Sequence, residues 1–294
     1  MTLIALLLAL VIERLATRLL HLREARWLQS YARGAIALAA RQPRPFAIVS
    51  CALATLLPAV PVAALAVLLA RDNPGLAWLG FASLVLVFSL GPRDLGEEVR
   101  DYISRENSGD VDGARRAAAA IMEHDAAQRR DMRAAAVEDA IFVQANNRVF
   151  GVLFWFVVLG PTGLGPAAAW LFRLSDLMRR AAIARSATDA TGGECAERLH
   201  FLLAWLPARL LALGYALAGS FEDARRSWRE MYLALPERML ERNDQLLVHV
   251  GRAAAGRTDT RPAGPAGAAL RLARHALFFW LAVIALLSLS ALIA

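Results

Sequence analysis

Residues 46–70 read FAIVSCALATLLPAVPVAALAVLLA, a run without one charged side chain. At about 1.5 Å per residue, a helix of this length crosses the ~30 Å hydrocarbon core of a bilayer. Residues 75–90 and 276–294 are uncharged as well. A membrane β-barrel would instead show alternating segments of about ten residues. The sequence therefore predicts an all-α, polytopic helical membrane protein associated with a lipid bilayer.

The composition supports this fold class and excludes several kinds of chemistry. Of the 294 residues, 57% are hydrophobic and the mean hydropathy is +0.42, whereas soluble domains are about 45–50% apolar. Every basic residue is Arg, which rules out Schiff-base, P-loop and general-base lysines. In a membrane protein the net charge of +7 indicates cytoplasmic loops and anionic headgroups. We expect no nucleic-acid partner.

The distribution of Arg predicts which side of the membrane each segment faces. Residues 1–20 form an apolar first helix that lacks a cleavage pattern, so we expect it to be retained. Residues 22–45 are rich in Arg and should be cytoplasmic. Residues 46–70 then cross outward and residues 76–90 return, ending at Gly91-Pro92. This arrangement is typical of a multi-pass protein of the bacterial inner membrane.

Two later apolar stretches are interrupted. Residues 150–172 break at GPTGLGP, and both flanks should be cytoplasmic, which predicts a re-entrant helical hairpin. Residues 199–218 contain Pro207 and Arg209, which predicts a second hairpin or an interfacial helix pair. The expected regions are a three-helix transmembrane region (1–92), a cytoplasmic helical insertion (93–149), broken hairpins (150–221), a cytoplasmic helical segment and linker (222–275), and a C-terminal transmembrane helix (276–294).

Several stretches together resemble a known family. They are MTLIALLLALVIERL at the start, RDL at 93–95, VED at 137–139, NNRVFGVLFWFVVLGPTG at 146–163 and WLPARLLALGYALAGSF at 205–221. In their order and spacing they resemble AmpE, an inner-membrane protein family linked to β-lactamase induction, within the CobD/CbiB superfamily. The resemblance implies a membrane-embedded modulator of the cell-wall-linked β-lactam response. It also implies cell-wall precursors or muropeptide-pathway proteins as partners.

The synthase branch of that superfamily, the adenosylcobinamide-phosphate synthases, is similar at RDL, at Phe154-Trp155 and at PARL. The chain departs from the synthase pattern elsewhere. A Gly-Arg-Asp-Thr stretch of the synthases falls near Glu123-His124-Asp125-Ala126, and an acidic-Asn-x-x-Asp stretch falls near Val143 to Asn147. The chain therefore lacks the Thr and an Asp that the synthase pattern has.

Charged residues within or beside apolar stretches are the candidate binding residues. Glu13 and Arg14 lie in the first helix, where a charge at bilayer depth costs at least ~2.5–3.5 kcal/mol unless it reaches the interface. Either they form an ion pair facing a central cavity, or they are interfacial charges. Glu138, Asn146 and Arg148 precede the first hairpin, and Arg209 follows in PARL.

Glu138 and Asn146 are eight residues apart, about two helical turns, and so share a helix face. With Arg148 and Arg209 they form either a pocket for an anionic ligand or a structural salt-bridge network. We interpret Arg179-Arg180 as a topology determinant or a lipid contact. The histidines, His200 included, lack a partner at metal-ligand spacing and are interpreted as structural.

Metal and cofactor sites are not expected. Cys51 and Cys195 are the only cysteines and show no CxxC or Cys/His spacing. Cys51 is interpreted as a small buried hydrophobe. Glu123, His124 and Asp125 are consecutive and diverge around a helix.

Two functions remain open. The first is a non-catalytic signalling or regulatory protein of the β-lactam response, as the AmpE resemblance implies. The alternative is a membrane enzyme related to adenosylcobinamide-phosphate synthase that acts on a small anionic substrate. The ligand and the oligomeric state do not follow from the sequence.

Overall fold

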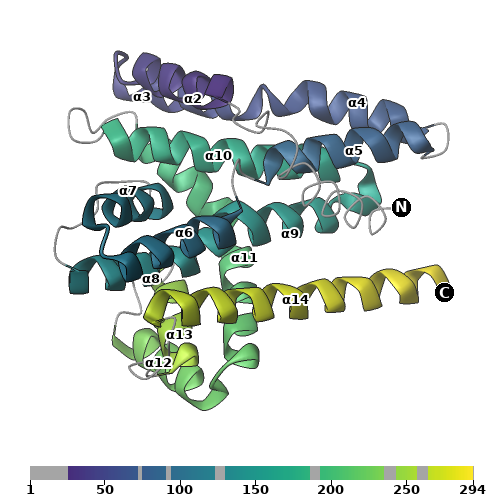
Figure 1. Ribbon diagram of the computed structural model, residues 1–294. Helices are drawn as coiled ribbons and strands as arrows, with labels where there is room; N and C mark the ends of the chain where they lie inside the picture. The colour runs from purple at the N-terminus through teal and green to yellow at the C-terminus, as the bar shows by residue number, and fades with distance from the viewer. Residues whose placement is uncertain are drawn as a thin grey trace. The chain divides into compact units, whose positions relative to one another are not determined.

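In the computed structural model, the described residues are 26–71, 75–90, 94–122, 130–185, 193–234, 243–256 and 264–293 (Figure 1). Within these ranges every regular element is a helix, and no strand occurs. The predicted all-α class is confirmed. The predicted first helix, with Glu13 and Arg14, lies outside the described residues, as does Gly91-Pro92.

The chain divides into two compact units, and each is interrupted in sequence by part of the other. The first unit comprises Met1–Pro92 and Asn147–Ala204. The second comprises Arg93–Asn146 and Trp205–Ala294. Two of the three unit boundaries, 146/147 and 204/205, fall inside continuous helical segments.

The first unit is organised around one central helix, α10 (Gly165–Arg185), most of whose residues are buried. This helix contacts α2, α3, α4, α5 and α9, and Figure 1 shows it running alongside them. The helices around it are α2 (Arg26–Ala39), α3 (Arg44–Leu56), α4 (Ala59–Arg71), α5 (Leu76–Ser89), α9 (Gly151–Val158) and the start of α11 (Gly193–Ala218).

The turn between α9 and α10 forms where the sequence predicts it, at GPTGLGP. A single 3-10 turn, η3 (Gly160–Thr162), has Pro161 as its second residue, and Gly163 then adopts a φ of 79°, a left-handed conformation that favours glycine. At Gly165 a β-carbon would collide with the carbonyl oxygen of Phe156. The two helices therefore fold back on each other as a hairpin.

At Pro207 the structure differs from the sequence expectation. Residues 199–218 are not a hairpin, because α11 continues as one helix with Pro207 inside it. A proline has no N–H, so the carbonyl four residues earlier loses its helical partner. That carbonyl belongs to Leu203, and it accepts a hydrogen bond from the Trp155 indole Nε1–H at 2.9 Å. The replacement donor lets α11 continue through the proline.

The second unit contains the insertion helices together with the C-terminal helices. Within it, α8 contacts α7, α13 and α14, and α6 contacts α7 and α14. The elements are α6 (Leu95–Ser108), α7 (Val111–Met122), α8 (Arg130–Gln144), α12 (Phe221–Ala234), α13 (Asn243–Ala255), α14 (Gly264–Ile293) and the remainder of α11.

A buried ion pair holds α6 against α8. Arg133 is 2% exposed, and its Nη2 lies 3.0 and 2.9 Å from the two carboxylate oxygens of Glu106. Both oxygens are engaged, the geometry that makes a buried pair favourable. Beside it, the buried Tyr102 hydroxyl has its pKa raised, mainly by burial and further by the Glu106 carboxylate, while Arg133 acts in the opposite direction.

Four helical segments in the described residues are long and apolar enough to cross a membrane: Arg44–Arg71, Met132–Val158, Gly193–Ala218 and Gly264–Leu287. Leu76–Ser89, which the sequence assigns to a crossing, has 14 residues, about 21 Å of helix. The segment Met132–Val158 joins α8, a π-helix η2 (Ala145–Phe150) and α9, so it continues past residue 149. The side of the membrane that each range faces stays a prediction.

The hydrogen bond between Trp155 and Leu203 generates a double-mutant test. Trp155→Phe should lower the free energy of unfolding by about 1–3 kcal/mol, because the Leu203 carbonyl loses its donor. In a Pro207→Ala background the restored N–H serves that carbonyl, so the same change should cost much less. Reversible unfolding in mixed detergent measures both values. Equal costs in the two backgrounds would contradict the assignment.

Candidate functional site

The helix α10 carries a buried polar segment in its middle. Arg173, Ser175 and Asp176 are buried there within a largely apolar helix. Burying a charge is costly unless it is paired and hydrogen-bonded. The local geometry therefore has to supply counter-charges close by.

Asp176 sits at the centre of an arginine cluster on its own helix. Its Oδ2 accepts from Arg173 Nη1 at 3.1 Å and its Oδ1 from Arg179 Nη2 at 3.1 Å. Arg180 Nη2 forms a further ion pair with Oδ2. The spacings are three and four residues, which place side chains on one helix face. Three guanidinium groups thus meet one carboxylate whose side chain is 0% exposed.

His200 of α11 extends the cluster. Its ring lies 5.3 Å from the Phe172 ring, centroid to centroid, and its Nδ1 is 3.1 Å from Ser175 Oγ. Ser175 Oγ also lies 2.7 Å from the Phe172 carbonyl and donates its one proton there. The Ser175 oxygen must then accept from Nδ1–H, which leaves Nε2 of the neutral ring as an acceptor.

That Nε2 atom is buried and has no hydrogen-bond partner among the residues that the structure describes. The positive charges of Arg173, Arg179 and Arg180 lie close enough to the His200 imidazole ring to interact with it electrostatically. Buried polar atoms are normally satisfied, so an orphaned acceptor beside arginines indicates a place for a ligand group. A ligand with an anionic group and a neighbouring O–H or N–H fits these donors and this acceptor.

The π-helix η2 contributes from the other arm of the hairpin. A β-carbon on Gly151 would collide with the Phe172 ring, so α9 and α10 pack closely at that level. Because the two helices run antiparallel, the turn before Gly151 lies at the level of the turn after Phe172. Asn147 and Arg148, both buried, belong to that preceding turn. π-helical turns are frequent at functional sites.

The residues that the sequence singles out have the following places. In the second unit, Glu138 Oε2 lies 3.6 Å from Arg252 Nε, which also contacts Asp139 Oδ1 at 2.6 Å. Arg209 Nη1 donates to Asn243 Oδ1 at 3.0 Å, and its guanidinium lies 4.0 Å over the Trp205 ring. Glu138 therefore takes part in an ion pair, and Arg209 makes a hydrogen bond and a cation–π contact; the role of both residues in ligand binding stays a prediction.

The predicted four-residue pocket is divided between the units. Arg148 belongs to the first unit, whereas Glu138, Asn146 and Arg209 belong to the second. Asn146 is fully buried in η2. Each residue is described within its own unit, so the joint pocket stays a prediction.

Sequence reasoning missed Asp176 because it lies in an Arg-rich flank that reads as a topology signal. One feature of the sequence does point to Asp176: it lies three or four residues from Arg173, Arg179 and Arg180, the spacing of residues on one helix face. His200 was interpreted as structural because no second ligand residue lies at metal-binding spacing from it in the sequence. The contact with Ser175 was not visible in the sequence.

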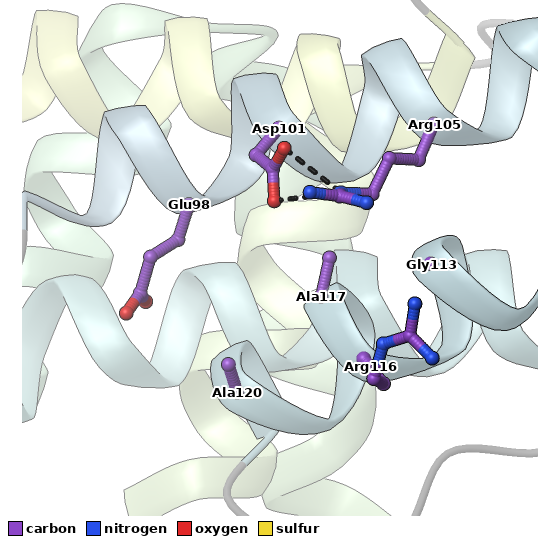
Figure 2. Close-up of a pocket in the computed structure, with 7 residues that line it drawn as sticks. All are labelled: Glu98, Asp101, Arg105, Gly113, Arg116, Ala117 and Ala120. Carbon is purple, nitrogen blue, oxygen red and sulfur yellow. Dashed lines mark hydrogen bonds and ion pairs between the residues drawn. The ribbon is translucent and has the colours of Figure 1, made fainter. Parts of the chain in front are cut away.

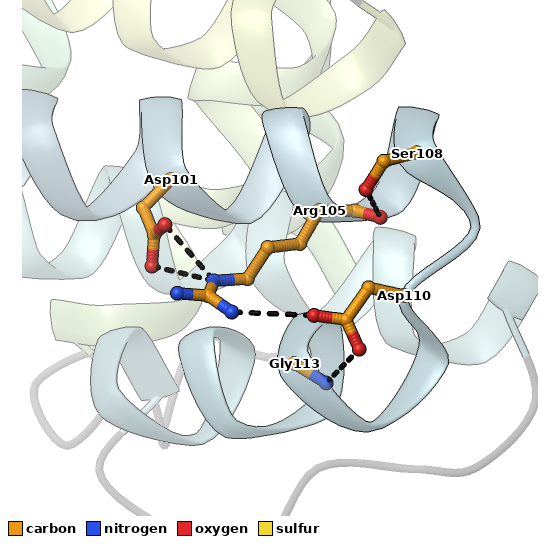
Figure 3. Close-up of polar contacts among 5 residues, drawn as sticks. All are labelled: Asp101, Arg105, Ser108, Asp110 and Gly113. Carbon is orange, nitrogen blue, oxygen red and sulfur yellow. Dashed lines mark hydrogen bonds and ion pairs between the residues drawn. The ribbon is translucent and has the colours of Figure 1, made fainter.

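The second unit has a separate hollow between α6 and α7, with a volume of about 240 Å³ (Figure 2). One of its charged residues, Arg105, is paired twice: its Nε lies 2.9 Å from Asp101 Oδ1, and its Nη1 lies 3.2 Å from Oδ2 of the nearby Asp110 (Figure 3). The lining residues are Glu98, Asp101, Arg105, Gly113, Arg116, Ala117 and Ala120. In the described part of the chain, no group of three or more His, Cys, Asp and Glu side chains is placed to hold a metal ion.

Comparison with known proteins gives a consistent family. Residues 3–270 match the family model described as CobD/Cbib protein. Over 158 residues the chain is 35% identical to the cobalamin biosynthesis protein CobD of Stutzerimonas stutzeri, which covers 53% of this chain and 50% of the relative. It is 30% identical over 146 residues to the protein of the same name from Chromobacterium violaceum, covering 49% and 45%.

The chain therefore spans about half the length of the curated relatives it matches. No solved structure matches it. The superfamily expected from the sequence is confirmed, whereas the relatives carry the name CobD rather than AmpE.

The Asp176 cluster predicts a large stability effect. Asp176→Asn removes the charge that three buried or half-buried guanidinium groups share, and should cost about 3–5 kcal/mol of unfolding free energy. Asp223→Asn is the matched control, because Asp223 is exposed and lies 3.9 Å from Arg226; it should cost at most ~1 kcal/mol. Detergent unfolding followed by circular dichroism compares them. Similar costs for the two variants would show that the Asp176 pairs are not the stabilising element.

The turn between α6 and α7 predicts a pH effect. Asp110 caps α7, and the backbone N–H of Gly113, 2.9 Å from Oδ1, lowers the pKa of its carboxyl, with Arg105 acting in the same direction (Figure 3). The carboxylate therefore stabilises the fold above its unfolded-state pKa and loses that effect as the pH falls through the lower folded value.

Asp110→Ala should reduce the thermal midpoint most at neutral pH, and the difference from wild type should shrink in acid. Asp112→Ala, in the same first turn of α7, serves as the control. A difference for Asp110→Ala that does not change with pH would contradict the role of the charge.

Proposed function

Because this chain belongs to the CobD/Cbib family, we propose that it is an inner-membrane enzyme that acts on a small anionic substrate, related to adenosylcobinamide-phosphate synthase. The single observation that carries the proposal is the buried cluster of Asp176, its three arginines and His200 in the first unit. The names of the relatives, cobalamin biosynthesis protein CobD, support a reaction on a cobalamin precursor.

The cluster contains the groups that such a substrate needs. Arginine presents a planar fork of donors that matches phosphate or carboxylate oxygens. Arg179 and Arg180 are partly exposed, at 15% and 19% of the side chain, whereas Asp176 is fully buried. In the proposed site Asp176 positions the guanidinium groups, and Arg179 and Arg180 face the anion.

His200 adds a proton acceptor beside the anion site. Its Nε2 carries the free lone pair, because Nδ1–H is engaged by Ser175. An acceptor within hydrogen-bond reach of a substrate hydroxyl or amine acts as a general base. The arginines bind the anionic end, and His200 takes the proton from the nucleophile.

A regulatory role in the β-lactam response is the second candidate. The observation that favours it is the departure from the synthase pattern near Glu123–Ala126 and at Val143–Asn147. In that case the same site binds an anionic ligand without turnover, and cell-wall precursors or muropeptide-pathway proteins are the partners.

Complementation of a single bacterial strain distinguishes the enzymatic function from the regulatory function. A bacterium lacking its own CobD is complemented with wild type, with Arg180→Gln and with Arg226→Gln, an exposed control. Corrinoid content by mass spectrometry and β-lactamase induction are measured in parallel. We expect wild type and Arg226→Gln to restore cobamide synthesis, and Arg180→Gln to reduce it at least about tenfold, the loss of roughly 1.4 kcal/mol of interaction.

Unchanged corrinoid levels together with altered β-lactamase induction would support the regulatory role instead. Complementation by Arg180→Gln at the wild-type level would overturn the assignment of the site. Immunoblots of membrane fractions confirm that the variants accumulate equally.

A further inference from the structure

The chain has only two cysteines, and the fold brings them together. Cys51 lies in the middle of α3, and Cys195 lies in the first turn of α11. They are far apart in sequence, yet both belong to the first unit, and both are free thiols. Neither side chain takes part in the Asp176 cluster.

The two helices meet along one face of α3. Cys195 Sγ lies 3.5 Å from the carbonyl oxygen of Ile48, one helical turn before Cys51. Cys195 packs against the core cluster that contains Cys51. One turn further back, Arg44 Nη2 and Glu194 Oε2 form an ion pair at 2.8 Å. Three successive turns of α3 therefore contact the start of α11.

The two thiols differ in accessibility. Cys51 is 0% exposed, whereas Cys195 is partly exposed. A reagent from solvent therefore reaches Cys195 first. The buried Cys51 is then the group positioned to react with whatever forms on Cys195.

We propose that Cys51 and Cys195 are a redox pair that closes to an intramolecular disulfide when a hydroperoxide oxidises Cys195. In the first step the Cys195 sulfur attacks the peroxide, the O–O bond breaks, and a sulfenic acid and an alcohol or water form. In the second step Cys51 sulfur attacks the sulfenic sulfur. The S–S bond forms, the S–O bond breaks, and the Cys51 proton leaves with the hydroxyl as water.

The disulfide covalently ties α3 to α11. Such a bond requires β-carbons about 3.5–4.5 Å apart, so it forms only where α3 and the start of α11 approach this closely. It closes a long loop and so restricts the unfolded chain, the condition in which cross-links stabilise most. A thiol reductant reverses it.

The test uses the full-length protein, reduced and reconstituted in lipid nanodiscs, with hydrogen peroxide as the probe. Proteolysis and mass spectrometry under non-reducing conditions should show one Cys51–Cys195 cross-linked peptide. The thermal midpoint should rise on oxidation and return after a thiol reductant. Cys51→Ala should instead leave a sulfenic acid on Cys195, trapped by a cyclic 1,3-diketone, with no rise in the midpoint.

The peptide map of the peroxide-treated wild-type protein tests the proposal by itself, so the test does not depend on whether Cys51→Ala folds. Cross-links only between chains, or peroxide-treated wild type in which Cys195 is trapped as sulfenic or sulfinic acid while Cys51 stays a free thiol, would overturn it. This result is independent of the anion site, because no step uses Asp176 or His200.

Discussion

The burial of Asp176 in the middle of α10 is the constraint on which the first unit depends. A fully buried carboxylate is tolerated because three arginines of the same helix reach it. The same α10 carries the apolar residues that contact α2, α3, α4, α5 and α9. The helix that organises the core therefore also carries the buried Asp176 cluster, so core packing and the proposed binding chemistry depend on one element.

The backbone around this helix is held by local replacements for missing hydrogen bonds. Pro207 frees the Leu203 carbonyl, and Trp155 of α9 supplies the donor. His200 lies one turn before Leu203 in α11, so the hydrogen bond between α9 and α11 is made next to the turn whose His200 ring contacts Ser175. Trp155 and Pro207, which are distant in sequence, thus act on the same carbonyl.

Much of the fold follows from periodicity and helix breakers. The apolar run at 46–70 and the turn at Gly160–Gly163 are predictable, because length and glycine conformation determine them. The continuity of α11 through Pro207 is not predictable, because the hydrogen-bond donor to the Leu203 carbonyl is Trp155, a residue distant in sequence. The candidate site was harder to predict than the fold. In the sequence Asp176 is one acidic residue among several arginines, and only its helical spacing from them and its burial indicate its role. Nothing in the sequence connects Glu138 with Arg252. Their contact depends on the packing of α13 against α8, which is a tertiary feature.

The most direct test of the account is an experimental structure of the protein in nanodiscs, determined with and without inorganic phosphate. The account predicts phosphate density in contact with Arg179 and Arg180 and within hydrogen-bond distance of His200 Nε2, with Asp176 still holding the guanidinium groups. Identical maps in both conditions, with the three arginines bound only to protein groups and His200 Nε2 hydrogen-bonded within the fold, would contradict it.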